Sequence, residues 1–168
     1  MVAAERADIA AFDFITAIFI NPATFPIPDD IVASDPADVA LDDLLQDEWD
    51  VVISDNLAQN QRIGVGAALR VSGSAQTFTV RGIVPAEAEA NFRDPLSAFF
   101  GFAYFDQIQK PLLSIDPRPN RISFGLPDEI TYEQINVAAN QLDGLLRPFT
   151  GQHRVVSVPS LVEQNVGI

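Results

Sequence analysis

The residues of this chain that could do chemistry are mainly carboxylates, and many of them lie between Asp29 and Asp50. Such a density of oxygen ligands could hold a divalent cation or dock a basic partner. An EF-hand loop would need oxygens at alternate positions, a central glycine and a terminal glutamate, and this order is missing. We therefore interpret the stretch as the solvated face of a helix from about Pro36 to Leu45, with apolar positions at Val39, Leu41, Leu44 and Leu45.

The sequence contains little evidence for residues that would carry out covalent catalysis or bind a nucleotide. The single histidine, His153, is interpreted as a surface or strand-edge residue, the chain has no cysteine, and no serine lies in a nucleophile-elbow sequence. Gly64-Val65-Gly66 begins a G-x-G pattern, but Leu69 occupies the third glycine position and a strand is expected to follow. A carboxylate pair for glycoside hydrolysis stays an alternative, because its separation is a property of the fold. We expect no catalytic residue, cofactor or metal ligand, and hence no enzyme.

The net charge and the length of the chain exclude further classes of function. The 168 residues suit one domain, and the formal net charge of −13 repels nucleic acid and anionic lipid headgroups. The longest uncharged run, residues 14–28, is too short for a membrane helix of about 20 residues and contains prolines. The start does not read as a secretory signal, because Glu5, Arg6 and Asp8 interrupt any apolar region. Nucleic acid is therefore excluded as a partner, and no segment of this chain is expected to span a bilayer.

The stretch from Val51 to Pro85 predicts the elements that would position any site. Val51–Ile53 is a strand, and Ser54-Asp55 should supply side-chain oxygens to the first backbone donors of a helix that ends by about Ile63. Residues 68–71 and 76–84 should form a hairpin. In its second strand, we expect Phe78, Val80 and Val84 to share one apolar face. Thr77, Thr79 and Arg81 should lie on the opposite, polar face.

Two apolar segments flank this stretch. Phe12–Ile20 is too continuously apolar for a half-exposed strand and is predicted to be a buried central strand. The proline-rich loop after it is a candidate boundary between lobes. Residues 96–105 place aromatic side chains on both faces of a strand, so the strand is covered twice or one face meets a partner. The candidate partner-contact residues are Phe99, Phe100 and Phe102.

The last unit is predicted from local signals. Thr131 followed by Gln134 makes a capping box that starts a helix near Tyr132. Its apolar stripe has spacings of three and four and consists of Ile135, Ala138, Ala139, Leu142, Leu145 and Leu146. The flanking strands, residues 121–125 and 154–158, should pair in parallel through this right-handed crossover. The fold class is therefore α+β, with mixed sheets.

Four segments of this chain also resemble those of a known family. Residues 51–58 (VVISDNLA), 63–66 (IGVG) and 78–84 (FTVRGIV) are similar to the extracytoplasmic core domain of MacB/FtsX-like ABC transporter permeases, as are residues 103–106 (AYFD). The resemblance covers roughly residues 49–158, and its elements are apolar patterns with one or two small residues. Two departures are visible: Ala67 stands where the family often places an acidic residue, and residues 1–48 match no known pattern.

The resemblance implies an organisation and a location. Residues 1–168 would be a single extracytoplasmic permease domain, with candidate lobes formed by residues 1–48 plus 112–168 (a βαβ-containing, porter-like lobe) and by residues 49–111 (a small, hairpin-rich lobe). The chain would lie between the first and second membrane helices of a longer protein, on the extracytoplasmic side of the cell membrane.

It also implies a function without chemistry. Such a domain couples movement of the membrane helices to the handling of substrate or partners. Its partners would be the cytoplasmic ABC ATPase, reached through the intact permease, the permease dimer mate, and an accessory extracytoplasmic protein. The alternative is an independent soluble binding or adaptor domain that captures a peptide or lipid in an aromatic groove around residues 99–105.

Overall fold

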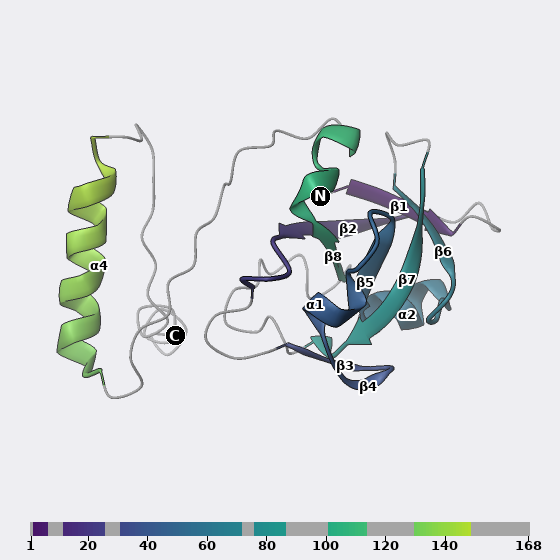
Figure 1. Ribbon diagram of the computed structural model, residues 1–168, viewed down its shortest axis with the longest axis horizontal. Helices are drawn as coiled ribbons and strands as arrows, with labels where there is room; N and C mark the ends of the chain where they lie inside the picture. The colour runs from purple at the N-terminus through teal and green to yellow at the C-terminus, as the bar shows by residue number, and fades with distance from the viewer. Residues whose placement is uncertain are drawn as a thin grey trace, which may run out of the picture. The chain divides into compact units, whose positions relative to one another are not determined.

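A computed structural model describes residues 2–6, 12–25, 31–71, 76–86, 101–113 and 130–148. The chain divides into two compact units, Met1–Ser123 and Phe124–Ile168. The first unit contains a β-barrel and a small two-stranded sheet, and the second contains one described helix (Figure 1). Within the described ranges, no helix is both long enough and apolar enough to cross a membrane.

Six strands close the barrel of the first unit. In spatial order they are β1 (Val2–Arg6), β2 (Phe12–Ile20), β8 (Phe102–Asp106), β5 (Asp50–Ser54), β7 (Thr77–Val84) and β6 (Ala68–Val71), and β6 pairs back onto β1. The pairs β2–β8 and β5–β7 are parallel, and the other four are antiparallel. This mixed sheet together with helices confirms the predicted α+β class. β2 has a neighbouring strand on each side, which confirms its predicted central position, but of its described side chains only Ile15 and Ile20 are buried, and residues 16–19 are half-buried.

The central strands β5 and β8 are buried on both faces. Val51 and Ile53 join an inner cluster inside the barrel, whereas Val52 joins an outer cluster. In the same way, Phe105 belongs to the inner cluster and Tyr104 to the outer one. Alternating side chains point to opposite faces of a strand, so a strand with no polar face needs cover on both sides. The barrel interior covers one face, and a cap formed by residues 31–45 covers the other.

A β-bulge in β7 changes the predicted orientation of Val84. Val51 is in register with Val80 but Val52 is in register with Gly82, so Arg81 is an extra residue on β7. Beyond Arg81 the faces exchange: Ile83 packs against the inner cluster and Val84 lies in the outer cluster. The prediction that Val84 shares a face with Phe78 and Val80 is therefore wrong, because period-two alternation ends at a bulge.

The cap replaces the long helix that the sequence predicted. It consists of β3 (Val32–Ser34), β4 (Ala37–Ala40) and the short helix α1 (Leu41–Leu44). The helix predicted from about Pro36 is wrong in its first half, because Asp38 has a φ of 60° and strand pairing joins Val32 to Ala40. The predicted apolar positions Leu41, Leu44 and Leu45 are nevertheless buried, since they face the outer cluster.

Helix α2 (Asp55–Gln61) follows β5 directly, as predicted. Leu57 and Ala58 are buried on its inner side, and Arg62 ends it in the left-handed region at a φ of 53°. The predicted capping role of Ser54 is wrong: its side chain makes no cap hydrogen bond, and its hydroxyl accepts instead from the backbone N–H of Phe102 at 2.9 Å.

Two short 3₁₀ helices follow β8, η2 (Gln107–Gln109) and η3 (Pro111–Leu113). Asp106 begins the first of them, because its carboxylate accepts from the backbone N–H of Ile108 at 3.0 Å.

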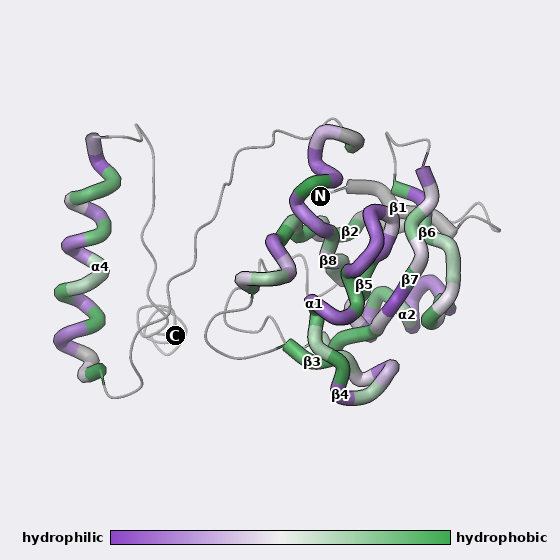
Figure 2. The backbone as a smooth tube through the Cα atoms, in the orientation of Figure 1, coloured by the Kyte–Doolittle hydropathy of each residue, from purple (hydrophilic) through white to green (hydrophobic). Residues whose placement is uncertain are grey.

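In the second unit, α4 spans Tyr132–Leu146 and begins with the predicted capping box. The backbone N–H of Thr131 donates to Gln134 Oε1 at 2.8 Å, and the backbone N–H of Gln134 donates to Thr131 Oγ1 at 3.4 Å. Hydrophobic and hydrophilic residues alternate along this helix (Figure 2). The predicted stripe is half-buried except at Leu145, which is 67% exposed. The predicted strands at 121–125 and 154–158 lie outside the described residues.

The division into lobes differs from the expectation in one respect. Residues 1–48 were assigned to a different lobe from residues 49–111, whereas β1 and β2 are hydrogen-bonded members of the same barrel as β5 to β8. Strand pairing, which depends on contacts far apart in the sequence, joins the two segments. The grouping of residues 112–168 with the amino-terminal third stays a prediction.

Candidate functional site

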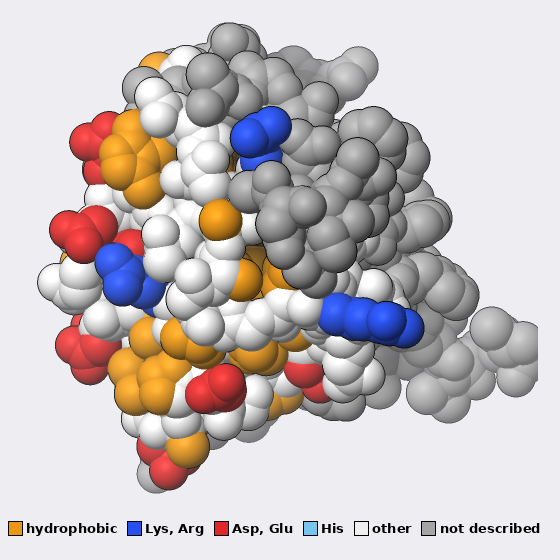
Figure 3. All heavy atoms as spheres, turned by 90° about the vertical axis from the view of Figure 1, so that its right-hand side faces the viewer, with side chains coloured by type: hydrophobic (Ala, Val, Ile, Leu, Met, Phe, Trp, Pro, Cys, Tyr) orange, Lys and Arg blue, Asp and Glu red, His pale blue; other side chains and the backbone are white. Residues whose placement is uncertain are grey.

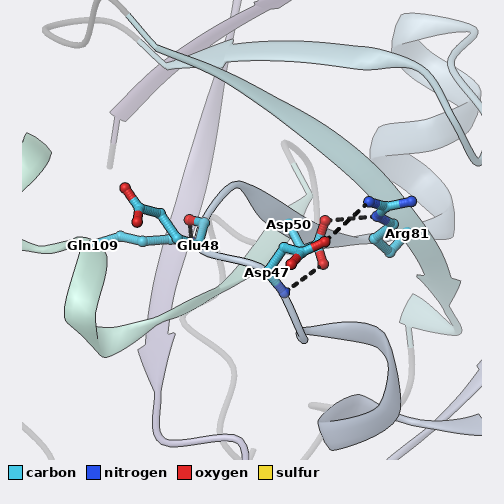
Figure 4. Close-up of polar contacts among 5 residues, drawn as sticks. All are labelled: Asp47, Glu48, Asp50, Arg81 and Gln109. Carbon is cyan, nitrogen blue, oxygen red and sulfur yellow. Dashed lines mark hydrogen bonds and ion pairs between the residues drawn. The ribbon is translucent and has the colours of Figure 1, made fainter.

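The most developed polar site among the described residues is centred on Asp50, the first residue of β5. Its carboxylate is 3% exposed and accepts from Arg81 Nε at 2.6 Å through Oδ1 and from the backbone N–H of Asp47 at 2.8 Å through Oδ2 (Figure 4). The backbone N–H of Asp50 donates to the carbonyl of Asp47 at 3.0 Å. Both carboxylate oxygens therefore have donors, which offsets the cost of burying this charge.

Arg81 reaches Asp50 from the bulge of β7. The hydrogen bond and the charge of Asp50 raise the pKa of Arg81 above its ordinary value, although partial desolvation opposes this. A second contact, from Arg81 Nη2 to Asp47 Oδ2 at 3.6 Å, involves side chains that are 47% and 77% exposed and is weak in comparison. The cluster therefore joins the start of β5 to the bulge of β7.

Gln109 forms a second buried polar contact near this turn. Its side chain is fully buried, and Nε2 donates to the carbonyl of Glu48 (Figure 4). Its Oε1 has no hydrogen-bond partner in the part of the chain that the structure describes. Nearby in sequence, Lys110 places Nζ 5.9 Å from the ring centroid of Phe19. These contacts attach the end of β8 to the turn before β5, and they bring together no reactive pair.

The arrangement has the chemistry of a structural ion pair. No group of three or more metal-ligating side chains occurs within the described ranges. On the face drawn in Figure 3, acidic side chains lie at several separate places rather than in one cluster. Asp38, Asp42 and Asp43 are exposed on the cap, which agrees with the interpretation of a solvated acidic surface. Asp50 and Arg81 connect β5 to β7, and both oxygens of the Asp50 carboxylate already accept hydrogen bonds.

The glycine pattern at Gly64-Val65-Gly66 forms a turn between α2 and β6. Gly66 has a φ of 84°, a conformation that glycine adopts without strain. Its backbone N–H donates to the carbonyl of Val80 at 2.7 Å, and the N–H of Ala67 donates to the carbonyl of Gly64 at 3.0 Å. These donors are used within the protein, and a strand follows the turn, so the turn does not have the form of a phosphate-binding loop.

The candidate partner-contact residues fall in different places. Phe102 is fully buried in the outer cluster, where its ring lies 5.5 Å from that of Tyr104 in an edge-to-face contact. It is not at the surface, because both faces of β8 are covered. Phe99 and Phe100 lie outside the described residues, as does His153. A contact through Phe99 and Phe100 therefore stays a prediction, and Phe102 is a core residue.

Sequence reasoning missed the pairing of Asp50 with Arg81. Asp50 was included in the acidic stretch, and Arg81 was placed on the exposed face of its strand. The available signal was that Asp50 directly precedes an apolar strand, where a carboxylate has to be paired if the strand is buried on both faces. The partner could not be chosen from the sequence, because Arg81 lies 31 residues away and the register that places it beside Asp50 includes a bulge.

Comparison with known proteins supports the fold. The sequence matches no protein-family model and no curated protein. The structure is similar to the crystal structure of the extracellular domain of the noncanonic ABC-type transporter YknZ from Gram-positive bacteria, with a TM-score of 0.55 and 14% identity over 92% of this chain and 73% of that chain. It is also similar to the periplasmic region of MacB from Actinobacillus actinomycetemcomitans, with a TM-score of 0.58 and 14% identity over 99% of this chain and 72% of that chain. The chain has the fold of these extracytoplasmic transporter domains, which confirms the resemblance in its sequence at the level of fold.

Proposed function

We propose that this chain is a non-catalytic extracytoplasmic domain of an ABC transporter permease. The observation that carries the proposal is the fold, which follows two solved transporter domains over 92% and 99% of the chain. Fold does not by itself imply function, so the proposal also depends on the site. The most buried carboxylate described, that of Asp50, is held by Arg81 in a structural role. The proposal assigns no catalytic residue and no cofactor.

The packing of the barrel suits a body that moves as a unit. Val51, Val52 and Ile53 are all fully buried, and so are Ala103 and Tyr104 opposite them. Close-packed interiors deform little, so a displacement applied at one part of such a core is passed on to the rest. In the proposed permease, membrane helices attached to the chain would supply that displacement. The domain would then pass it to bound substrate or partners.

The proposed partners are those of an ABC permease. They are the cytoplasmic ATPase, reached through the membrane helices, a second permease subunit, and an accessory extracytoplasmic protein. Phe99 and Phe100 are proposed to contribute to a partner contact. Alanine at both positions should reduce transport without lowering the thermal stability of the domain, and Ile108→Ala is the control, because Ile108 is a described apolar residue that is 60% exposed. An equal loss of transport in both variants would count against the assignment of the contact.

Location can be tested by thiol labelling in intact cells, because the chain has no cysteine of its own. A single cysteine at Gln59, which is exposed on α2, should react with a membrane-impermeant maleimide added outside the cell. Val80→Cys is the matched control, since Val80 is fully buried and should react only after denaturation. Labelling of Gln59→Cys only after lysis would overturn the extracytoplasmic assignment.

Coupling requires the intact permease. Replacing residues 1–168 by a short Gly-Ser linker should abolish transport while the ATPase continues to hydrolyse ATP. Unchanged transport would overturn the proposed function. The alternative, a soluble domain that captures a peptide or lipid, would instead be supported by a native reading frame without membrane spans on either flank.

A further inference from the structure

We propose that the exposed side of α4 is a contact surface for a second copy of this chain, and that the two helices pack antiparallel with Asn140 at the centre. α4 is the helix Tyr132–Leu146 of the second unit (Figure 1). The proposal deepens the proposed function, because it assigns a surface to the contact with a second permease subunit. It rests on that function for the presence of such a subunit.

Five exposed residues form a continuous stripe along α4, which is called the α4 stripe below. Their successive spacings are four, three, four and three positions, and residues spaced in this way lie on one side of a helix. The α4 stripe consists of Glu133, Val137, Asn140, Gly144 and Arg147. Its large apolar member, Val137, is 51% exposed, and Arg147 keeps helical backbone angles directly after the helix. The α4 stripe is therefore a side of the helix that a partner can reach.

The charge of the chain restricts where two copies can meet. Each copy has a formal net charge of −13, so two copies repel each other over most approaches. The cap, for example, exposes Asp38, Asp42 and Asp43. The α4 stripe has one acidic residue at one end, one basic residue at the other and uncharged residues between them. Two copies can therefore approach each other through the α4 stripe without bringing charges of one sign together.

The order of the two charges decides the orientation of the helices. In a parallel pair, Glu133 would lie beside Glu133 of the second copy, and like charges in contact are unfavourable. In an antiparallel pair centred on Asn140, Glu133 and Arg147 are equally far from the centre, so each Glu133 lies beside Arg147 of the second copy. Arg147 Nη2 already contacts Asp143 Oδ2 at 2.9 Å, and a guanidinium has enough donors for a second carboxylate. Charge complementarity therefore favours the antiparallel pair.

The same register places Val137 beside Gly144 of the second copy. Their distances from the centre differ by one residue, which is about 1.5 Å along the helix axis. No described atom lies within 4 Å of a Cβ built at Gly144, so this position is open to the valine side chain. Glycine weakens a helix relative to alanine, and the close approach of a second helix accounts for its presence here. Asn140 meets its own copy at the centre, where facing amides fix the register.

The size of this contact predicts its strength. The α4 stripe is about 21 Å long, because fourteen residues separate its ends. One helix pair of this length is smaller than a standard protein interface of about 1,600 Å², so two free chains should associate weakly. Two copies held in one permease would have an effective concentration of about 1 mM or more. The contact is therefore expected to form between tethered copies and to be detectable in the isolated chain at about 1 mM.

Disulfide formation between two copies tests the position of the contact, because the chain has no cysteine of its own. At about 1 mM, Asn140→Cys should form linked dimers about 10-fold faster than Leu145→Cys under the same mild oxidant. Leu145 is the matched control, since it is 67% exposed and lies about 100° around the helix from Gly144. Equal rates, or a faster rate for Leu145→Cys, would overturn the proposal. The test uses the isolated chain, so that result would leave the permease function standing, whereas labelling of Gln59→Cys only after lysis would overturn the function alone.

A charge exchange tests the orientation. In the Asn140→Cys chain, Glu133→Lys should slow dimer formation about 5-fold, because the lysine would lie beside Arg147 of the second copy. This substitution makes the chain less acidic, so general repulsion between the copies predicts a faster rate instead. Adding Arg147→Glu restores the original net charge and exchanges the two ends of the α4 stripe, and the rate should return to its original value. A faster rate for Glu133→Lys, or no recovery in the double variant, would overturn the antiparallel contact.

Discussion

The hydroxyl of Ser54 accepts a hydrogen bond from the backbone N–H of Phe102 at 2.9 Å, and this buried bond joins the end of β5 to the start of β8. Ser54 is also in register with Val84, the last residue of β7. Ser54 therefore lies between the end of β7, at Val84, and the start of β8, at Phe102. This explains why a serine that precedes a helix does not cap it: its oxygen is already used between strands.

Ser54→Ala should destabilise the domain by about 1–3 kcal/mol, because it removes the hydroxyl that accepts from the backbone N–H of Phe102 in a buried hydrogen bond. The measurement is the free energy of unfolding in urea, with wild type as reference. Ser34→Ala is the control, since its exposed hydroxyl donates to the carbonyl of Ile83 at 3.1 Å and water can replace it. A loss for Ser54→Ala no larger than that for Ser34→Ala would contradict this role.

Gly101→Ala should be costly for two independent reasons. Gly101 has a φ of 82°, and a Cβ at this position would lie 2.7 Å from Leu57 Cβ and 3.0 Å from Ser54 Oγ. Backbone strain and overpacking together should destabilise the domain by about 2–4 kcal/mol. Gly64→Ala is the matched control, because nothing lies within 4 Å of the added Cβ. Thermal unfolding of both variants checks the prediction, and similar melting temperatures would show that the junction tolerates a side chain.

The contact between Gly82 and Leu44 should show energetic coupling. A Cβ on Gly82 would lie 2.6 Å from Leu44 Cδ1, at the flexible end of a buried side chain. Gly82→Ala should therefore destabilise the domain by about 1–3 kcal/mol when Leu44 is present and by less in the Leu44→Ala background. A double-mutant cycle in urea measures the difference. If the free-energy changes of the two substitutions simply added, Leu44 in the cap and residue 82 in the bulge would not be energetically coupled.

The Asp50–Arg81 pair should stabilise the fold across the neutral pH range. The hydrogen bond and the charge of Asp50 raise the pKa of Arg81 above its ordinary value in the folded protein. The stability contributed by the arginine charge is therefore fully present below that ordinary value and is lost only as pH rises through the raised pKa. Arg81 is charged at roughly pH 6 and at roughly pH 9. The loss of its charge in Arg81→Ala should therefore lower the melting temperature by the same amount at both values of pH.

Asp47→Ala is the control for that experiment. Asp47 is 77% exposed and lies 3.6 Å from the guanidinium, so its removal should have a much smaller effect than that of Arg81. If the two variants lost the same stability, the buried hydrogen bond to Asp50 would not be the source of the effect.

The accuracy of the sequence predictions depended on the distance over which each feature is determined. The capping box of Thr131 and Gln134 and the helix α2 were predicted correctly, because hydrogen bonds between residues a few positions apart create them. The helix predicted from Pro36 failed because pairing between β3 and β4 competes with it. Likewise, the partner of Asp50 could not be found, since it lies 31 residues away and becomes accessible through a bulge.

The sequence by itself determined the α+β class, the order of the elements around β5 and the family whose fold the chain shares. Apolar periodicity and small residues at turns carry that information locally. Only the tertiary structure decided that the sheet closes into a barrel, that Val84 and Phe102 face an outer cluster, and that Ser54 binds a strand rather than a helix. The physical reason is that each of these depends on the register between strands, and one residue of shift moves a side chain to the opposite face.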